Sequence, residues 1–432
     1  MSGTSRRRSH LRAWSDPRLL LLNLGSLLAS PLLLLNWIRR SVFRSKHSPF
    51  VANRLSGRPF TELGAGEGAH IVIAGASYGE AILIDRLTRA LKESLGSTRI
   101  TWAIRDPQTV AQLRETHPQQ AVTAWPYENI VSASQWVKHT QPDVLVFVER
   151  FRFPNFVHAA KLSGAKVVLV NGRYGKTPSG YLRWVLSGFS TMLFQTEEYL
   201  AKASPALTAA TRAIAAGDIK FDLTSINTSA ETGAGIDLWI GGVEEPILAA
   251  GSTDSLTEEK VVLDSLVTIR NQRPVKLLIA PRKLERAEEL VAEIKARGLS
   301  VSRRTNPNPD ADVFVLDTMG ELSYAYKHCA AAYVGGSLFG MGHNVIEPVE
   351  WGLPVAYGRN RGHFELMQKA CEEAGVGRRV GDADELVDFW RWALEEGTNL
   401  QEACSKLVAS NRGALEQTTQ EISALIRELE AR

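Results

Sequence analysis

The sequence predicts an α/β fold with two domains, each built around a parallel sheet, and three observations support this prediction. Short apolar runs alternate with longer helical patterns, which is typical of parallel strands covered by helices on both faces. The alternation stops in a stretch rich in Ser, Thr, Gly and Ala at 224–235, and then begins again. The length of 432 residues exceeds one ordinary hydrophobic core and suits two.

The predicted elements follow this alternation along the chain. In the first half, the expected strands are 71–74, 100–104, 144–148 and 166–170, and the expected helices include 80–94 and 156–163. In the second half, the expected strands are 246–250, 276–280, 313–316 and 331–334. The predicted domains are a basic, leucine-rich segment at 1–46, a Rossmann-like domain at 47–223, a second Rossmann-like domain at 236–405 and a C-terminal helix at 406–432.

The composition is that of a globular protein, with 44% hydrophobic and 22% charged residues. The net charge of +3 is unevenly distributed, because residues 1–46 contain nine Lys and Arg against one acid. The remaining 41 basic and 46 acidic residues give the body a charge of about −5, which does not indicate a general nucleic-acid-binding surface. The three cysteines, Cys329, Cys371 and Cys404, have no zinc-site or disulfide-framework spacing, and indicate reduced thiols in the cytosol.

The segment 1–46 is the candidate for membrane attachment. Residues 19–38 form a leucine-rich span of 20 residues, which is long enough to cross a bilayer. Asn, Ser and Pro interrupt this span and arginines flank both ends, as in a helix that lies in the membrane interface against anionic headgroups. We expect a membrane anchor that either spans the bilayer or lies in the interface; a helix buried in the protein core is the alternative.

The stretch 332–358 combines a predicted strand, a glycine loop and a predicted helix. Gly335 and Gly336 end the apolar strand, and a helix that contains Glu347 is expected directly after Gly342. This order can direct backbone N–H groups and the positive end of a helix dipole at a phosphate. The Glu347 carboxylate would then accept hydrogen bonds from ribose hydroxyls. An ordinary tight turn between strand and helix is the alternative.

Glu80 is the candidate catalytic residue of the first domain. It follows Ser77 and Gly79 at a helix start, beyond the carboxyl end of the strand at 71–74. Ligands of open α/β sheets bind at this end of the strands, so the Glu80 carboxylate is expected to point into the crevice where a ligand would bind. Alternatively, its carboxylate only stabilises the helix N-terminus, by at most about 1 kcal/mol.

These two stretches resemble motifs of the 3-deoxy-D-manno-octulosonic acid (Kdo) transferases, glycosyltransferases of GT-B fold that transfer Kdo from CMP-Kdo to a lipid A precursor. The family's GGS, followed by a short loop and GGHNxxEP, resembles 335–337 and 341–348, with Met341 in place of a glycine and the loop about one residue shorter. The family's Ser-x-Gly-Glu motif resembles 77–80. The resemblance implies two Rossmann-like domains that face a central cleft, with Glu80 as the general base.

Further motifs occur in the family's order in both halves. They are VVLVNGRY at 167–174, QTEE at 195–198, GDIKFD at 217–222, AGST at 250–253, APRK at 280–283 and DTMGEL at 317–322. The resemblance therefore covers most of residues 70–370, and an ordered series of this kind is more specific than any single glycine loop.

Some positions depart from the family pattern. The family's Glu-Thr-Glu-hydrophobic-Trp-Pro-Asn aligns with ERFRFPN at 149–155, where Phe151 replaces the second acid between Arg150 and Arg152. An aromatic side chain between cations favours an acceptor of different charge or shape, whereas a variation at the rim of the site is the alternative. Asp254 and Lys283 replace family histidines.

The resemblance implies roles for individual residues. Arg282 would bind the donor phosphate or the sugar carboxylate, with a surface salt bridge as the alternative, and Lys220 would be a second cation of the cleft. The predicted donor-binding residues are Ser252, Thr253, Arg282, Gly320, Glu321, Gly336, Ser337, Gly342, His343, Asn344 and Glu347. The predicted acceptor-side residues are Ser77, Gly79, Glu149, Arg150, Arg152, Asn155 and Lys220.

These inferences predict an inverting transfer of Kdo in lipopolysaccharide biosynthesis, at the cytoplasmic face of the inner membrane. The expected partners are a nucleotide sugar, a lipid A-type glycolipid and the membrane surface, without nucleic acid, metal ion or cofactor. Because of Met341, Phe151, Asp254 and Lys283, a GT-B transferase for another nucleotide-activated sugar or lipid acceptor is an alternative. A non-catalytic, membrane-tethered module that binds a nucleotide sugar is another.

Overall fold

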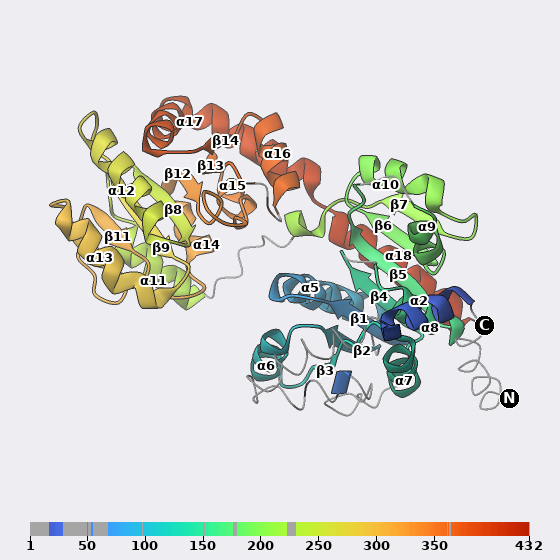
Figure 1. Ribbon diagram of the computed structural model, residues 1–432. Coiled ribbons are helices and arrows are strands. Elements are labelled where there is room, and N and C mark those ends of the chain that lie inside the picture. The colour runs from blue at the N-terminus through green and yellow to red at the C-terminus, as the bar shows by residue number, and fades with distance from the viewer. Residues whose placement is uncertain are drawn as a thin grey trace. The chain divides into compact units, whose positions relative to one another are not determined.

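The computed structural model describes residues 17–28, 50, 53–54, 68–96, 98–149, 152–175, 179–222, 230–360, 362 and 364–431. The chain forms two compact units, which are drawn in Figure 1. The first unit comprises Met1–Leu223 and Arg412–Arg432, and the second comprises Thr224–Asn411.

The first unit contains a seven-stranded sheet in which every strand pair is parallel. The spatial order is β3-β2-β1-β4-β5-β6-β7. The strands are β1 (His70–Gly75), β2 (Arg99–Ile104), β3 (Ala121–Ala124), β4 (Val144–Val148), β5 (Lys166–Gly172), β6 (Thr191–Phe194) and β7 (Arg212–Ala215). The chain builds outward from β1 in one direction and returns to β4 on its other side, so the strand order reverses between β1 and β4.

Helices cover both faces of this sheet. One core layer packs β1, β2 and β4 against α5 (Tyr78–Leu95), α6 (Pro107–Thr116) and α18 (Ala414–Glu430). The other packs the opposite strand faces against α7 (Ile130–Thr140), α8 (Pro154–Leu162), α9 (Gly180–Leu186) and α10 (Glu197–Ala203). Two short 3-10 helices, η3 (Ser204–Ala206) and η4 (Ile219–Asp222), flank β7. All five residues of β4 are buried, as expected for a strand covered on both faces.

The C-terminal helix α18 belongs to the first unit, where Figure 1 shows it among the strands and helices of that unit. Its first turn is fixed by Asp222, whose carboxylate accepts hydrogen bonds from Gly413 N at 2.8 Å and Leu415 N at 2.7 Å. Ile422 and Ile426 are buried against the same core as α5. The chain therefore completes the first core only after it has built the second unit.

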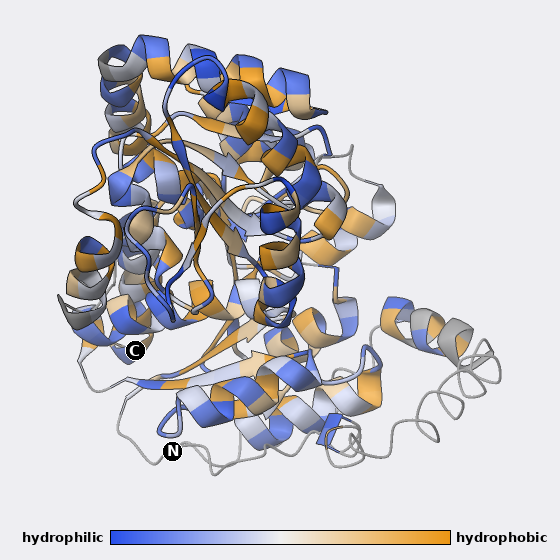
Figure 2. Ribbon diagram, turned by 90° about the vertical axis from the view of Figure 1, so that its left-hand side faces the viewer, coloured by the Kyte–Doolittle hydropathy of each residue, from blue (hydrophilic) through white to orange (hydrophobic). Residues whose placement is uncertain are grey.

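The second unit also contains seven parallel strands, in the order β10-β11-β9-β8-β12-β13-β14. The strands are β8 (Ile247–Thr253), β9 (Lys276–Pro281), β10 (Val301–Arg303), β11 (Val313–Val315), β12 (Cys329–Val334), β13 (Val355–Gly358) and β14 (Gly377–Val380). The strand order reverses between β8 and β12, as it does between β1 and β4 in the first unit. Figure 2 shows hydrophobic and hydrophilic residues alternating around the helices of both units.

The helices of the second unit surround this sheet. They are α11 (Ala230–Ile240), α12 (Leu256–Arg270), η5 (Leu284–Arg286), α13 (Ala287–Ala296), α14 (Leu322–Ala325), η6 (Tyr326–His328), α15 (Ile346–Glu350), α16 (Glu365–Glu373) and α17 (Ala383–Asn411). Helix α17 is bent at Gly397, whose backbone is not helical, and it runs through residue 405, where a domain boundary was expected. The second unit extends to Asn411.

The prediction of two α/β domains with parallel sheets is confirmed. Every expected strand is present, whereas β3, β6, β7, β10, β13 and β14 were not predicted. Each of these has three or four residues, and so short a run carries little periodicity of its own. They form because neighbouring strands supply their hydrogen-bonding partners.

The expected membrane helix is not confirmed. No helix in the described part of the chain combines the length and the apolar character needed to cross a membrane. Of the predicted span, residues 29–38 lie outside the described residues, and 19–28 belong to α2 (Pro17–Leu28). One face of α2 packs on the first unit, since Leu19 is fully buried against Ile130, Trp184 and Val185.

Asn23 adds polar contacts to this packing of α2. Its side-chain amide donates to Asn155 Oδ1 at 2.7 Å, and its side-chain oxygen accepts from Ile130 N at 2.9 Å. Leu21 and Leu24 are 70% and 55% exposed. The buried-helix alternative therefore describes one face of α2, whereas Leu21 and Leu24 are available to an apolar environment.

Substitution of Asn23 tests this docking. Asn23→Ala removes the partner of two buried polar groups, and we expect it to lower the free energy of unfolding by about 1–3 kcal/mol. Leu24→Ala, on the exposed side of α2, is the control and should change it by less than about 0.5 kcal/mol. Urea denaturation followed by tryptophan fluorescence measures both, and equal effects would refute the docking.

Candidate active site

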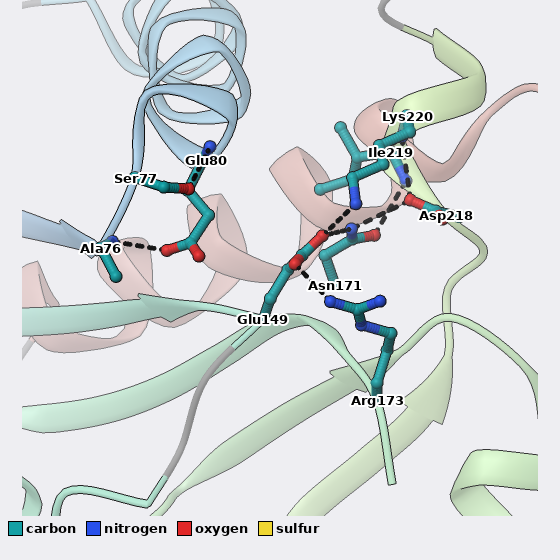
Figure 3. A network of polar contacts seen from close by, with 9 residues as sticks. All are labelled: Ala76, Ser77, Glu80, Glu149, Asn171, Arg173, Asp218, Ile219 and Lys220. Carbon is teal, nitrogen blue, oxygen red and sulfur yellow. Dashed lines mark hydrogen bonds and ion pairs between the residues drawn. The ribbon is translucent and has the colours of Figure 1, made fainter. Parts of the chain in front are cut away.

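Glu80 lies in the first turn of α5, immediately beyond β1. Ser77 is the N-cap, and its hydroxyl accepts a hydrogen bond from Glu80 N at 3.4 Å. The Glu80 carboxylate turns back and accepts from Ala76 N at 2.5 Å (Figure 3). A side chain on Gly75 would collide with Ile84 and press on Glu80, so the glycine that ends β1 makes room for this turn. Glu80 is thus buried and oriented by the backbone.

Glu149 follows β4, the strand beside β1, and is the centre of a second polar network (Figure 3). Its carboxylate pairs with Lys220 at 2.6 Å and with Arg173 at 2.8 Å. Asn171 donates to it at 3.3 Å and also to Asp218 at 2.9 Å. Burial opposes ionisation of Glu149, but the two cations outweigh this and hold the pKa of its carboxyl below its usual range.

The strand order explains why these two carboxylates share one edge of the sheet. Glu80 and Glu149 follow β1 and β4, the adjacent strands between which the strand order reverses. Ligands of open α/β sheets bind in the crevice at this position. Figure 3 shows both side chains at this edge. The structure thus brings together Ser77, Gly79, Glu80, Glu149 and Lys220 from the predicted residues of the first domain.

Asn155 is not part of the Glu149 network. It is buried at the start of α8, where its backbone N–H donates to Glu128 Oε1 at 2.5 Å and its side chain accepts from Asn23. Burial raises the pKa of Glu128 to about 7, against the opposing hydrogen bonds from Asn155 and Phe156. Asn155 therefore joins α2, α8 and the loop before α7. Arg152 is exposed, and Arg150 and Phe151 lie outside the described residues.

Backbone strain collects at the same edge of the sheets. Among the described residues, four other than glycine have φ in the left-handed region: Gln141, Glu149, Asn171 and Ser252. Gln141 ends a helix, where this conformation is common. The other three lie at the carboxyl ends of β4, β5 and β8. Strained backbone of this kind is concentrated at functional sites in proteins.

In the second unit, the predicted donor residues gather at the ends of β8 and β12. The two strands end so close together that a Cβ on Gly335 would lie 2.7 Å from Ser252 O. Arg282, at the end of β9, is tied to β8 because its N–H donates to Thr253 O at 2.8 Å. Thr253 is buried, and its hydroxyl donates a hydrogen bond to Glu259 at 2.7 Å. The hydroxyl proton of Thr253 is therefore bonded within the protein.

The glycine loop is held by internal hydrogen bonds. Gly335 N donates to Gly251 O, Gly336 N to Glu258 and Gly342 N to Gly336 O. These three N–H groups thus have protein partners, contrary to the expectation that the loop directs its N–H groups at a phosphate. Gly336 and Gly342 have φ of 80° and 73°, which explains why glycine is needed. Ser337 is buried, and its hydroxyl accepts from Gly358 N at 2.6 Å.

The helix after the loop begins later and is shorter than expected. Helix α15 begins at Ile346 and has five residues, so its dipole is that of a single turn. Asn344 organises its start by accepting from Ile346 N at 3.0 Å and donating to Glu347 at 3.4 Å. Burial raises the pKa of Glu347 to about 6, while Asn344 and Arg282 act in the opposite direction.

His343 stands beside these groups. Burial lowers its pKa, and the charge of Arg282 adds to this, with Asp254 opposing both. His343 Nε2 has no hydrogen-bond partner among the described residues. The loop therefore presents a neutral imidazole near the Arg282 guanidinium and the Asp254 carboxylate, and such a set can bind an anionic, hydroxyl-bearing ligand.

Gly320 and Glu321 lie beyond β11, two strands away from β8. Glu321 accepts from Arg304 at 3.1 Å and from the Thr318 hydroxyl, which places it in a local network. Trp351 Nε1 donates to Ser323 O at 2.6 Å and links this segment to the end of α15. Gly320 and Glu321 are therefore connected to the loop region through α14 and α15.

Several residues of these networks were not singled out from the sequence. Asn171, Arg173 and Asp218 lie in motifs that matched the resemblance, but nothing local distinguishes them from neighbouring polar residues. Glu258 has a local signal, because Ser255 and Glu258 form the S-x-x-E pattern of a capping box. Its other contacts depend on β12, which is distant in sequence.

Comparisons with known proteins show which sequences this chain is similar to. Residues 46–223 match the family described as 3-deoxy-D-manno-octulosonic-acid transferase (kdotransferase). The enzyme of that name from Bordetella pertussis is 28% identical over 320 residues, or 69% of this chain and 73% of that protein. The one from Haemophilus influenzae is 28% identical over 373 residues, which is 80% of this chain and 85% of that protein. The protein is a glycosyltransferase similar to the Kdo transferases.

Solved structures show that this Kdo-transferase-like chain has a GT-B fold. A glycosyltransferase from Rickettsia africae matches with a TM-score of 0.56 and 14% identity, over 84% of this chain and 98% of that one. The UDP-GlcNAc 2-epimerase from Neisseria meningitidis matches with a TM-score of 0.58 and 11% identity, over 83% of this chain and 100% of that one. At these identities the likeness concerns the fold alone.

The Glu149 network provides a stability test. Glu149→Gln leaves Lys220 and Arg173 without their carboxylate, and we expect it to lower the free energy of unfolding at pH 7 by about 3 kcal/mol. Because the pKa of Glu149 is lowered in the folded protein, its contribution is present above the usual glutamate range and is lost as the pH falls. The difference between wild type and variant should therefore shrink below about pH 4.

Glu198→Gln is the matched control for this experiment. Glu198 forms an exposed pair with Lys202, and the same substitution should change the free energy of unfolding by less than about 1 kcal/mol. Urea denaturation between pH 3 and 8 measures both variants. A pH-independent effect of Glu149→Gln, or one no larger than that of the control, would contradict the assigned role.

Proposed function

We propose that this protein transfers Kdo from CMP-Kdo to a lipid A-type glycolipid, with inversion at the anomeric carbon. The observation that carries the proposal is the buried, backbone-oriented Glu80 at the carboxyl end of β1, in a chain similar to the Kdo transferases. A carboxylate held in this way can accept a proton without losing its orientation. The reaction needs no further cofactor.

In the proposed reaction, Glu80 accepts the proton of an acceptor hydroxyl. The hydroxyl oxygen forms a bond to the anomeric carbon of Kdo, and the bond from that carbon to the phosphate oxygen breaks. CMP leaves with the bonding electrons, and a single displacement inverts the anomeric centre. The hydrogen bond from Ala76 N keeps Glu80 in place while its charge changes.

Donor binding is assigned to the second unit. Arg282 is exposed at the end of β9 and offers paired N–H groups to the phosphate or the Kdo carboxylate. The Glu347 carboxylate would accept hydrogen bonds from the ribose hydroxyls. The Asn344 side-chain amide orients this carboxylate by donating to its Oε1 at 3.4 Å. His343, which is neutral at pH 7, would shape the nucleotide pocket.

We further propose that the protein acts at the cytoplasmic face of the inner membrane. The basic residues of 1–46 would bind anionic headgroups, and the exposed Leu21 and Leu24 would enter the interface. An interfacial helix is compatible with the packing of the opposite face of α2 on the first unit. The membrane surface and the glycolipid are then the partners, and no nucleic acid is expected.

A transferase for another acidic nucleotide sugar is the second candidate. Met341 is 55% exposed in the glycine loop, and Asp254 stands near His343, so both lie where they would affect the donor. Asp254 places a negative charge where the family has a histidine. This charge changes which donor groups the loop repels as well as which it attracts.

Glu80→Gln tests the catalytic assignment. The amide oxygen still accepts from Ala76 N, but the amide cannot take a proton, so we expect turnover to fall by about 10²- to 10⁴-fold. CMP affinity and the melting temperature should stay close to wild type. Kdo transfer from CMP-Kdo to a lipid A precursor, measured under single-turnover conditions, gives the rate.

Glu93→Gln is the control for this measurement, because Glu93 lies exposed near the end of the same helix. Its rate should equal that of wild type. Wild-type turnover by Glu80→Gln would reduce Glu80 to a helix-capping residue. A wild-type protein that bound CMP but transferred no sugar would favour the binding module over the enzyme.

Glu347→Gln tests the donor site. We expect CMP to bind the wild type more tightly than UDP or ADP, and the substitution to weaken CMP binding by about tenfold at pH 7.5, because an ionised acceptor is lost. The pKa of Glu347 is about 6, so the wild-type carboxyl is increasingly protonated below that pH. The difference between wild type and variant should therefore shrink as the pH falls through 6.

Isothermal titration calorimetry between pH 5.5 and 8 measures these affinities, and comparison with the variant removes the titration of the CMP phosphate itself. Glu373→Gln, a change to an exposed residue of α16, is the control and should bind CMP as wild type does. Equal CMP affinities for wild type and Glu347→Gln at pH 7.5 would remove Glu347 from the donor site.

A further inference from the structure

Glu258 occupies a position that the proposed reaction does not use. It lies in the first turn of α12, directly beyond β8, and its side chain is 1% exposed. Burial raises the pKa of this carboxyl, and the hydrogen bonds it accepts act in the opposite direction. A buried carboxylate is costly unless it is well bonded, so its contacts show what it stabilises.

Three donors from separate parts of the second unit meet at this carboxylate. Oε2 accepts from Asp254 N at 2.8 Å, which fixes the connection between β8 and α12. Oε1 accepts from the Tyr333 hydroxyl of β12 at 2.7 Å and from Gly336 N at 2.8 Å. One side chain thus holds together the ends of β8 and β12, the adjacent strands between which the strand order reverses.

The contact with Gly336 extends into the rest of the loop. Gly336 O accepts from Gly342 N at 3.0 Å, which closes the loop on itself. The Gly336 Cα packs so closely on His343 that an added Cβ would lie 2.8 Å from the imidazole. The position of Gly336 therefore determines where Gly342 and His343 stand.

The local geometry of Glu258 repeats that of Glu80. In both units a serine caps the first helix after the first strand, the glutamate three residues later donates its N–H to that serine, and its Oε2 accepts from the N–H before the serine. The hydrogen bonds that Oε1 of Glu258 makes to Tyr333 and Gly336 go beyond this helix cap. A helix-capping role alone leaves them unexplained.

We propose that Glu258 is a positioning residue for donor binding, which holds the loop 335–344 in its binding conformation by fixing Gly336. This inference rests on the proposed function for the identity of the ligand, but the positioning itself is a property of the unliganded protein. Glu258 acts through Gly336 and His343 and does not touch the donor.

Glu258→Gln is the principal test. The amide has one acceptor oxygen, and its NH2 group faces an N–H donor where the carboxylate had its second oxygen, so Gly336 N or Asp254 N loses its partner. We expect faster hydrogen exchange in peptides that cover 335–344 of the unliganded full-length protein. We also expect CMP to bind about tenfold or more weakly by calorimetry. In transfer assays the change should appear mainly as a raised KM for the donor.

Asp312→Asn is the matched control. Asp312 also accepts an N–H and an O–H from one residue, Ser300, and pairs with Arg270, but it lies at the amino end of β11. Whatever its effect on the melting temperature, exchange in 335–344 and the Kd for CMP should equal those of wild type in this variant. The comparison separates positioning from general destabilisation.

Tyr333→Phe keeps the test decisive if Glu258→Gln does not fold. It removes one of the three donors and introduces no donor–donor contact. Exchange in 335–344 should rise above wild type, and less than in Glu258→Gln where both can be measured. The Kd for CMP should also be higher than in wild type, and lower than in Glu258→Gln where both can be measured.

Wild-type exchange in 335–344 together with wild-type CMP affinity in Glu258→Gln would overturn the inference. If Glu258→Gln does not fold, wild-type exchange in Tyr333→Phe overturns it instead. A wild-type protein that binds no CMP refutes the proposed donor, but the exchange of the unliganded loop still decides the positioning role. Faster exchange in 335–344, with Asp312→Asn unchanged, supports it.

Discussion

The point at which the strand order reverses is the constraint on which the chemistry of both units depends. Because all strands are parallel, the connections from β1 and β4, and from β8 and β12, leave the same edge of each sheet in opposite directions. The residues placed there include Glu80 and Glu149 in the first unit and Thr253 and Gly336 in the second. Three of the four strained non-glycine residues in the described chain lie at this edge, so its geometry is imposed by the surrounding sheet.

The same serine-capped helix start occurs after β1 and after β8, but its glutamate has different contacts in the two units. A serine cap and a returning carboxylate orient Glu80 beside β4 and Glu258 beside β12. In the second unit, the Glu258 carboxylate accepts hydrogen bonds from the Tyr333 hydroxyl of β12 and from Gly336 N just beyond that strand. Glu258 therefore holds the loop in place. In the first unit, Glu149 beyond β4 is itself a carboxylate and is neutralised by Lys220 and Arg173. The contacts of the neighbouring strand therefore distinguish Glu258, which accepts from Tyr333 and Gly336, from Glu80, to which we assign the proton transfer of the proposed reaction.

The N-terminal segment shows how packing can divide a hydrophobic stretch between two environments. Leucine-rich sequence between arginine clusters predicted membrane attachment, and α2 does expose Leu21 and Leu24. Its other face is part of the first unit through Leu19 and Asn23, and Asn23 continues into the Asn155 and Glu128 contacts. Asn155, which the resemblance assigned to the acceptor side, thus has a structural role in joining these elements.

The sequence by itself determined the α/β class, the two parallel sheets, their longest strands and the positions of Glu80 and the glycine loop. These follow from local periodicity, from glycines that permit turns, and from motifs that occur in the order of the family they resemble. Only the tertiary structure decided which polar residues act together. Lys220 and Glu149 are 71 residues apart, and Glu258 and Gly336 are 78 apart, and no local pattern encodes such pairs. It also decided that the N–H groups of Gly335 and Gly336 are bonded within the protein, because their acceptors, Gly251 O of β8 and Glu258 of α12, are distant in sequence and meet the loop only in the folded unit.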